Sequence, residues 1–214
     1  MGRLALVGGN SIVGVDVPDG DWEVVQRHGD NYALPHEIDN EANMRLVAES
    51  GCDRVLAIGS VGGLKRELGP GTFVCPTDFV ALSRTPSSRG DRTAHLVPGF
   101  DPDWRRAVVD AWDRRAQVPL VDGGVYWQTA GPRLETRAEI RLIAAHAEVV
   151  GMTIGSESVL ALELGLAYAA VCLVDNLANG VGERELTIAE LEAGRAANRR
   201  RLATALEGVL PELA

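Results

Sequence analysis

The sequence predicts a single α/β domain over residues 1–214, in which helices cover both faces of a mixed central β-sheet, a three-layer α/β/α arrangement. Short apolar runs typical of buried strands alternate with segments of helical periodicity. The predicted strands end in glycine or polar residues. With 46% hydrophobic and 24% charged residues, the composition is close to the globular average, and 214 residues suit one ordinary domain.

We expect buried strands at Arg3–Val7, Asp53–Ile58 and Val171–Val174. Each run is followed at once by small or polar residues: Gly8-Gly9 after the first, 59–63 (GSVGG) after the second, and Asp175-Asn176 after the third. Ligands of open α/β sheets bind beyond the carboxyl ends of the strands. The sequence therefore predicts a binding site where these segments meet.

The helical segments alternate with the strands in a way that suits a covered sheet. They are predicted at Glu37–Ser50, Asp103–Ala116, Glu135–His146, Ser156–Leu164 and Ile188–Leu210. The last is an amphipathic helix whose many arginines are expected to be exposed. Residues 83–99 are rich in Ser, Arg, Thr, Gly and Pro, which indicates an exposed loop within the domain.

The charge balance argues against nucleic acids and membranes as partners. Lys and Arg total 21 against 30 Asp and Glu, and the net charge of −9 repels phosphate backbones and anionic lipid surfaces. The longest apolar run, near Leu166–Val174, is about half of the ~20 residues that a membrane span needs. Arg3–Val7 is too short for the apolar part of a signal peptide. We therefore expect a cytoplasmic protein.

Cysteine and histidine spacing predicts neither disulfides nor a metal site. The three cysteines show no CxxC spacing and lie in apolar stretches, so we expect reduced core thiols at Cys52, Cys75 and Cys172. The four histidines form neither HxH nor HExxH and are scattered over the chain at His28, His36, His95 and His146.

Two glycine clusters and one basic pair could present donors to an anion. Gly8-Gly9-Asn10-Ser11 and residues 59–63 allow close backbone approach and left-handed conformations. Neither has GxGxxG spacing or the lysine of a P-loop, so each by itself is better explained as a tight turn. Arg27-His28 combines a guanidinium with an imidazole, which suits phosphate, although a solvated surface turn is the better explanation of the pair when it is taken alone.

Residues 123–141 (GGVYWQTAGPRLETRAEIR) are the most informative stretch. They closely resemble the signature of the trimeric purine nucleoside phosphorylase and methylthioadenosine phosphorylase family, in which a GGVY strand leads into GPxFET and AE opens a helix. Further matches cover nearly the whole chain in the family's order: Arg27-His28-Gly29, 35–38, 42–43, 62–64, 70–71, 150–153 with Glu157, 160–166 and 176–180. Several separate matches in one order make chance similarity improbable.

The resemblance implies phosphorolysis, in which inorganic phosphate attacks C1′ of a nucleoside and releases the purine and ribose 1-phosphate. An oxocarbenium-like transition state needs an anion at C1′ and stabilisation of the leaving base, and no protein nucleophile. No metal or organic cofactor is implied. By resemblance the phosphate contacts Asn10, Ser11, Arg27, His28, Gly59, Ser60 and Thr153. The implied nucleoside-binding positions are Met152 beneath the ribose, Leu134, Asp175, Ala178, Leu186 and His95.

Base specificity is expected from Glu135 and Asn176, to which the resemblance gives the catalytic roles. A 6-oxopurine carries a proton on N1 that a carboxylate accepts, whereas adenine presents a lone pair there. The Asn176 amide can donate to N7 or O6 of the departing base. Adenosine-type members of the family have Ser and Asp at these two places, so this chain is expected to act on inosine, guanosine or 5′-methylthioinosine.

The expectations for the pocket at the 5′ end of the sugar and for the oligomeric state rest on the resemblance alone. Leu186 and Ile188 could form an apolar 5′ pocket, so both a 5′-hydroxyl and a 5′-methylthio group stay possible. His95 matches a histidine that the neighbouring subunit supplies in methylthioadenosine-type trimers, although a solvated loop histidine explains it equally. We expect a homotrimer or a dimer of trimers.

Four departures from the family pattern leave rival functions open. Asn10 and Gly59 replace hydroxyl residues of the phosphate site, Leu134 replaces an aromatic residue, and Asp175 stands beside the base reader. If Asp175 and not Asn176 contacted the purine, a preference for adenine nucleosides would be expected instead. The rivals are a methylthioadenosine phosphorylase, a nucleosidase that uses water, and a purine-binding relative with little catalysis. A dinucleotide-binding domain is disfavoured because no GxGxxG follows the first strand.

Overall fold

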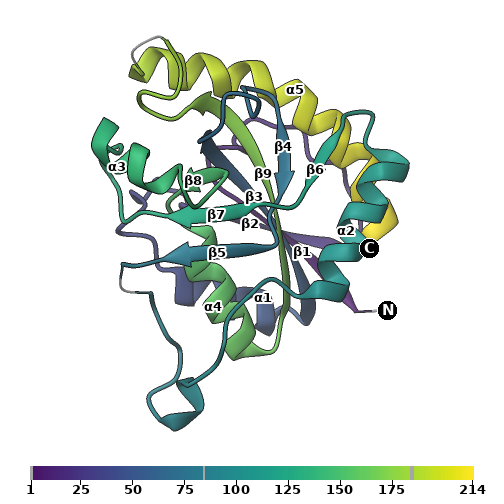
Figure 1. Ribbon diagram of the computed structural model, residues 1–214. Helices are drawn as coiled ribbons and strands as arrows, with labels where there is room; N and C mark the ends of the chain where they lie inside the picture. The colour runs from purple at the N-terminus through teal and green to yellow at the C-terminus, as the bar shows by residue number, and fades with distance from the viewer. Residues whose placement is uncertain (1, 84, 184–185) are drawn as a thin grey trace.

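The computed structural model describes residues 2–83, 85–183 and 186–214 (Figure 1). Its strands are β1 (Arg3–Gly8), β2 (Trp22–Gln26), β3 (Cys52–Gly63), β4 (Phe73–Cys75), β5 (Asp78–Ala81), β6 (Leu120–Asp122), β7 (Val125–Gln128), β8 (Val149–Gly151) and β9 (Ala167–Leu177). Its helices are α1 (Asn40–Glu49), α2 (Pro102–Arg115), α3 (Arg137–Ile143), α4 (Ile154–Leu164) and α5 (Ile188–Leu213), with a 3-10 turn, η1, at Arg92–Ala94.

The strands form one mixed sheet, which confirms the predicted class. Strands β2, β1, β3 and β9 lie side by side and parallel, whereas β8 pairs antiparallel with β3, and β4 pairs antiparallel with β9. In the parallel register Gly8 pairs with Ile58, and Gly62 pairs with Asn176. The carboxyl ends of the parallel strands therefore meet at one edge of the sheet, as the sequence predicts.

Helices cover both faces of this sheet, so the three-layer prediction is confirmed (Figure 1). Alternate residues of β1 point to opposite faces, because side chains alternate along a strand. Ala5 belongs to the core cluster that contains Met44 of α1 and Leu160 of α4. Leu6 belongs to the cluster that contains Trp112 of α2 and Leu206 of α5.

Two helices begin later than predicted because of their caps. Helix α1 begins at Asn40 instead of Glu37, and the Asp39 side chain accepts a hydrogen bond from the Ala42 N–H. Helix α3 begins at Arg137 instead of Glu135, where Thr136 and Glu139 form a capping box. The predicted start at Glu135 is therefore wrong, and Glu135 lies on the loop before the helix.

Strands β3 and β9 extend beyond their predicted ends. The glycines of residues 59–63 lie within β3 and none of them adopts the left-handed conformation that an anion-binding nest needs. A Cβ at Gly59 would lie 2.5 Å from Cδ1 of Ile154, and one at Gly63 would lie 2.2 Å from the Leu68 carbonyl oxygen. The expected loop is therefore a strand whose glycines allow close packing, and β9 likewise carries Asn176 within it.

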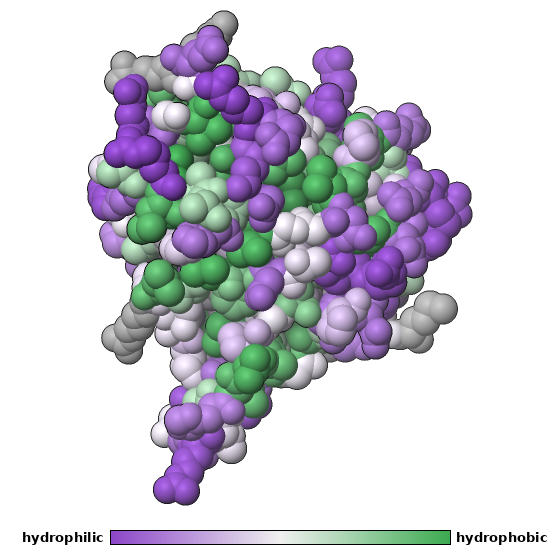
Figure 2. Space-filling model, viewed as in Figure 1, coloured by the Kyte–Doolittle hydropathy of each residue, from purple (hydrophilic) through white to green (hydrophobic). Residues whose placement is uncertain are grey.

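The predicted loop between β5 and α2 projects from the body of the molecule, with η1 near its tip (Figure 1). Residue 84 lies outside the described residues. Figure 2 shows hydrophobic side chains near the base of this projection and hydrophilic ones at its end. Within it, Val97 is 94% exposed.

The three cysteines are free and buried, as predicted. Burial raises the pKa of the Cys75 thiol to about 12 and also raises the pKa of Cys172. We expect an aromatic disulfide reagent at pH 8 to modify no thiol of the folded protein within minutes and all three after unfolding in guanidinium. Rapid modification of any thiol in the folded protein would contradict this burial.

Among the described residues, no helix combines the length and apolar character needed to cross a membrane. Within the same residues, no group of three or more His, Cys, Asp or Glu side chains could hold a metal ion.

Candidate active site

A cavity of about 510 Å³ opens at the carboxyl ends of the parallel strands, and its size lies in the range of small-molecule sites. Its walls come from the ends of β1, β2, β3, β8 and β9 and from α5. Among its lining residues are the predicted positions Asn10, Arg27, His28, Ser60, Leu134, Glu135, Met152, Thr153, Asn176, Ala178 and Leu186. The structure therefore brings together most of the predicted site.

The Arg27 guanidinium forms the most buried ion pair of this cavity. Its Nε and Nη2 donate to the two carboxylate oxygens of Glu157, and Nη1 donates to the Ile58 carbonyl oxygen at 2.9 Å. Arg27 is 3% exposed and Glu157 is fully buried. Tyr168 also donates to Glu157, at 2.6 Å. The charge of Arg27 is thus already balanced, although the residue still lines the cavity.

His28 lies directly after Arg27 and presents its second nitrogen beside the loop that follows β1. The Nδ1 atom lies 2.7 Å from the Ala33 carbonyl oxygen, which can only accept, so Nδ1 carries the proton. Burial lowers the pKa of His28, and the positive charges of Arg27 and Arg195 add to this effect. The neutral ring stacks on Tyr32 with centroids 4.8 Å apart. Its Nε2 atom is therefore free to accept a hydrogen bond near Gly9.

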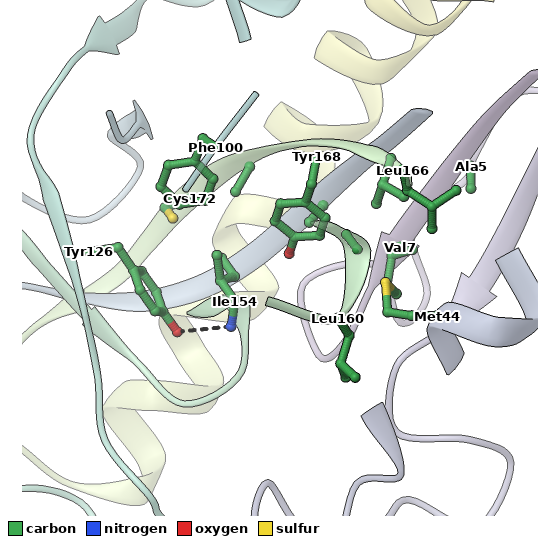
Figure 3. Packing of buried hydrophobic residues seen from close by; sticks show 14 of the residues in the cluster. Ala5, Val7, Met44, Phe100, Tyr126, Ile154, Leu160, Leu166, Tyr168 and Cys172 are labelled. Carbon is green, nitrogen blue, oxygen red and sulfur yellow. Dashed lines mark hydrogen bonds between the residues drawn. The ribbon is translucent and has the colours of Figure 1, made fainter. Parts of the chain in front are cut away.

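The other residues predicted to contact phosphate differ in whether their polar groups already form hydrogen bonds within the protein. Asn10 donates to the Tyr32 hydroxyl at 2.7 Å, and the Ser60 hydroxyl donates to the Asp175 carboxylate. Thr153 is the N-cap residue of α4, but its hydroxyl makes no capping hydrogen bond. The Tyr126 hydroxyl instead accepts from the backbone N–H of Thr153, at 3.1 Å, and of the next residue, as Figure 3 shows for Ile154. The Thr153 hydroxyl thus stays available to a ligand.

Glu135 and Asn176 lie farther along the cavity. Gly62 of β3 pairs with Asn176 of β9 and lies two residues beyond Ser60, a distance of roughly 7 Å along a strand. The Glu135 carboxylate accepts from the Thr129 hydroxyl at 2.6 Å, which leaves its second oxygen for a ligand. Glu135 is buried at 8% exposure. The same cavity is therefore lined by a carboxylate and an amide as well as by the candidate anion donors.

Four predicted site residues do not line this cavity. Ser11 is buried and donates to the Ile58 carbonyl oxygen, and Gly59 packs against Ile154. Asp175 is 2% exposed, and its carboxylate is covered by Ser60 and Asn198, which both donate to it. His95 lies on the projecting loop after η1. Because Asn176 and not Asp175 lines the cavity, the arrangement that would favour adenine is not the one observed.

Several lining residues were not predicted from the sequence, and Arg195 of α5 is the most notable. Its position could have been found from the helical spacing. Residues 188, 191, 195, 198, 202, 205 and 209 recur every three or four positions along α5 and form one stripe, with Arg195 and Asn198 standing at otherwise apolar places. A charged residue on a buried stripe indicates a polar partner or a ligand.

Comparisons with known proteins identify the family of this chain. The family model described as the phosphorylase superfamily matches residues 17–211. The chain is 38% identical over 191 residues to a probable 6-oxopurine nucleoside phosphorylase of Archaeoglobus fulgidus, covering 88% of this chain and 79% of the relative. It is 41% identical over 170 residues to a probable S-methyl-5′-thioinosine phosphorylase of Methanothermobacter thermautotrophicus, covering 78% of this chain and 60% of that relative. The chain thus spans only about three fifths of the second relative.

Solved structures show the same fold. A methylthioadenosine phosphorylase from Schistosoma mansoni in complex with tubercidin has a TM-score of 0.79 at 22% identity, and the match covers 99% of this chain and 92% of that one. This likeness concerns the fold alone. From the family match, which spans most of the sequence, and from the 38% identical relative, the chain belongs to the phosphorylase superfamily.

Proposed function

We propose that this protein is a purine nucleoside phosphorylase, which uses inorganic phosphate to cleave the N-glycosidic bond of 6-oxopurine nucleosides. The observation that carries this proposal is that one cavity is lined by Glu135 and Asn176 together with Arg27, His28 and Thr153. Relatives named as 6-oxopurine nucleoside and S-methyl-5′-thioinosine phosphorylases support it.

In the proposed reaction an oxygen of phosphate forms a bond to C1′ while the bond from C1′ to the purine nitrogen breaks. The electron pair of the broken bond leaves with the base, which then takes a proton from solvent. Asn176 stabilises the departing base by donating a hydrogen bond as negative charge develops. The anion donors hold phosphate against the cationic sugar, so the transition state is stabilised from both sides. No metal or organic cofactor takes part in this proposal.

Selection of the base is assigned to Glu135. Its unshared carboxylate oxygen accepts from N1–H of a 6-oxopurine, and the Thr129 hydroxyl holds the other oxygen in place at 2.6 Å. Adenine would present a lone pair to the same carboxylate, which is repulsive. Hypoxanthine and guanine nucleosides are therefore preferred over adenosine.

The sugar 5′ end is assigned to the start of α5. Leu186, Ile188 and Leu191 line the cavity there and present an apolar surface. Such a surface fits a 5′-methylthio group as well as a hydroxymethyl group. We thus include 5′-methylthioinosine beside inosine and guanosine as a substrate.

We further propose that the enzyme acts as a homotrimer in the cytoplasm. The free, buried cysteines are consistent with a reducing compartment. The projecting loop is consistent with a contact between subunits, because Leu82 is 80% exposed and Val97 is 94% exposed, and His95 stands between them in the sequence, outside the cavity of its own chain. Light scattering at micromolar protein concentration tests the mass of the assembly.

The direct test is base release from inosine, guanosine, adenosine, 5′-methylthioinosine and 5′-methylthioadenosine, each with and without phosphate. We expect phosphate-dependent release of hypoxanthine and guanine. Release of adenine alone would replace the proposal with a methylthioadenosine phosphorylase. Release without phosphate would indicate a nucleosidase, and hypoxanthine binding without any turnover would indicate a purine-binding relative.

A further inference from the structure

Arg195 lies on the packed side of α5, where the helix touches β9. A Cβ at Gly194 would lie 2.0 Å from the backbone oxygen of Asp175, so the helix backbone meets the strand at this point. Asn198, one turn farther along, is 4% exposed and donates to the Val174 carbonyl oxygen and to the Asp175 carboxylate. These contacts hold Arg195 against the wall of the cavity that it lines.

The hydrogen-bonding capacity of the Arg195 guanidinium is not satisfied by the described residues of the protein. Its Nε atom is buried and has no hydrogen-bond partner among the described residues. The Asp175 carboxylate lies 3.8 Å from this nitrogen, beyond hydrogen-bond distance, and already accepts from Ser60 and Asn198. A buried donor without an acceptor is costly. The Nε atom itself is enclosed beside Asp175, but the side chain as a whole is 32% exposed and lines the cavity, so its terminal nitrogens are left to donate to a ligand.

The other guanidinium groups on the wall of the cavity are already paired. Arg27 forms a bidentate pair with Glu157, and Arg133 donates to both carboxylate oxygens of Glu139, at 2.9 and 2.8 Å. Of the arginines in the described part of that wall, Arg195 alone lacks a hydrogen-bonded carboxylate. A phosphate anion that enters a protein with a net charge of −9 needs such a cation.

On the basis of the proposed function, we propose that Arg195 binds the phosphate cosubstrate directly and sets the affinity of the site for it. It is connected to two of the proposed phosphate contacts. Its charge acts on His28, and Asp175 links it to Ser60. The Arg195 guanidinium adds hydrogen-bond donors to a site in which Asn10 and Gly59 stand in place of the hydroxyl residues of the family pattern.

The test compares Arg195→Leu, Arg195→Lys and Arg200→Leu with the wild type. Arg200 is an exposed arginine of the same helix outside the cavity, so it is a matched control. We expect Arg195→Leu to raise the KM for phosphate about 10- to 100-fold, the usual worth of a hydrogen bond to a charged group. The KM for inosine and kcat should change less than about threefold, Arg195→Lys should be intermediate, and Arg200→Leu should match the wild type.

A second measurement does not depend on turnover. Phosphate added without nucleoside should raise the Tm of the wild type and of Arg200→Leu, and this shift should be lost in Arg195→Leu. An unchanged phosphate KM, or a change that falls on inosine instead, would overturn the inference. If the wild type releases no base, the proposed function fails and the Tm shift decides alone: an equal shift in all variants, or none in the wild type, overturns the role of Arg195.

Discussion

Replacement of Glu157 by leucine is expected to lower the free energy of unfolding by about 3–5 kcal/mol, since it leaves a buried charge without its partner. The Arg27 guanidinium is 3% exposed and donates two hydrogen bonds to this carboxylate. Burial lowers the pKa of Arg27, but the charge and hydrogen bonds of Glu157 outweigh this effect and hold the pKa above the normal range. When Glu157 is removed, the guanidinium still keeps its proton because arginine is intrinsically so basic, and its charge is then left buried. Tyr168 would lose its acceptor as well.

Urea unfolding at one fixed protein concentration, followed by tryptophan fluorescence, measures this change. Glu41→Leu is the matched control, because Glu41 pairs with Arg45 on the exposed face of α1 at 2.7 Å. Surface pairs of this spacing contribute about 0.3–0.5 kcal/mol. The double variant Arg27→Met with Glu157→Leu should recover much of the lost stability, because no charge is then left buried. A loss below about 1 kcal/mol for Glu157→Leu alone would refute the buried pair.

Much of the fold could be predicted because local patterns determine it. The unbroken apolar run of β1 can be recognised from adjacent residues alone. The caps of α1 and α3 are equally local, although the predicted helix starts missed them. The partner of Arg27 could not be found in this way, because Glu157 lies 130 residues away and only the parallel sheet brings the two together. The family match at residues 150–153 included Glu157, but it did not indicate which residue Glu157 contacts.

The ends of β3 and β9 were missed because glycine and polar residues normally terminate strands. Here Gly59 and Gly63 are required by close packing against Ile154 and Leu68, so the strand continues through them. This extension moves Asp175 into the protein and leaves Asn176 at the cavity. The pairing with β3 skips Asp175 at this point, since Val61 pairs with Val174 and Gly62 with Asn176, and this local irregularity decides which of the two neighbours can contact a ligand.

Many arginines of the last helix were expected to be exposed, but the sequence did not single out Arg195, whose side chain is 32% exposed and lines the cavity. The orientation of a helix about its own axis depends on what it packs against. In α5 the apolar stripe passes through Leu191 and Leu202, with Arg195 and Asn198 between them. Composition averaged over the helix hides these two polar residues on the stripe.

Glu135→Gln is expected to lower kcat/KM for inosine about 10- to 100-fold, because a hydrogen bond from N1–H to a charged carboxylate is replaced by a neutral contact. Glutamine keeps the shape of the side chain, and its amide can keep a hydrogen bond with the Thr129 hydroxyl, which holds the carboxylate at 2.6 Å. When the amide nitrogen faces a 6-oxopurine, this nitrogen and N1–H are both donors, so no hydrogen bond forms between them. The same nitrogen can donate to the lone pair on N1 of adenine.

Parallel kcat/KM measurements with inosine and adenosine at saturating phosphate test this assignment, since the ratio of the two should shift toward adenosine. Glu139→Gln is the control: Glu139 lies four residues on, pairs with Arg133 and caps α3, and glutamine also suits its place in a capping box. An unchanged ratio in Glu135→Gln would remove Glu135 from base recognition. An equal loss of kcat/KM for both nucleosides would mean that the carboxylate positions the loop before α3. The shape of this loop also depends on the hydrogen bond that Asn179 donates to the Glu135 carbonyl oxygen. Because glutamine leaves that backbone contact intact, a selective loss for inosine can arise only from the chemistry of the side chain.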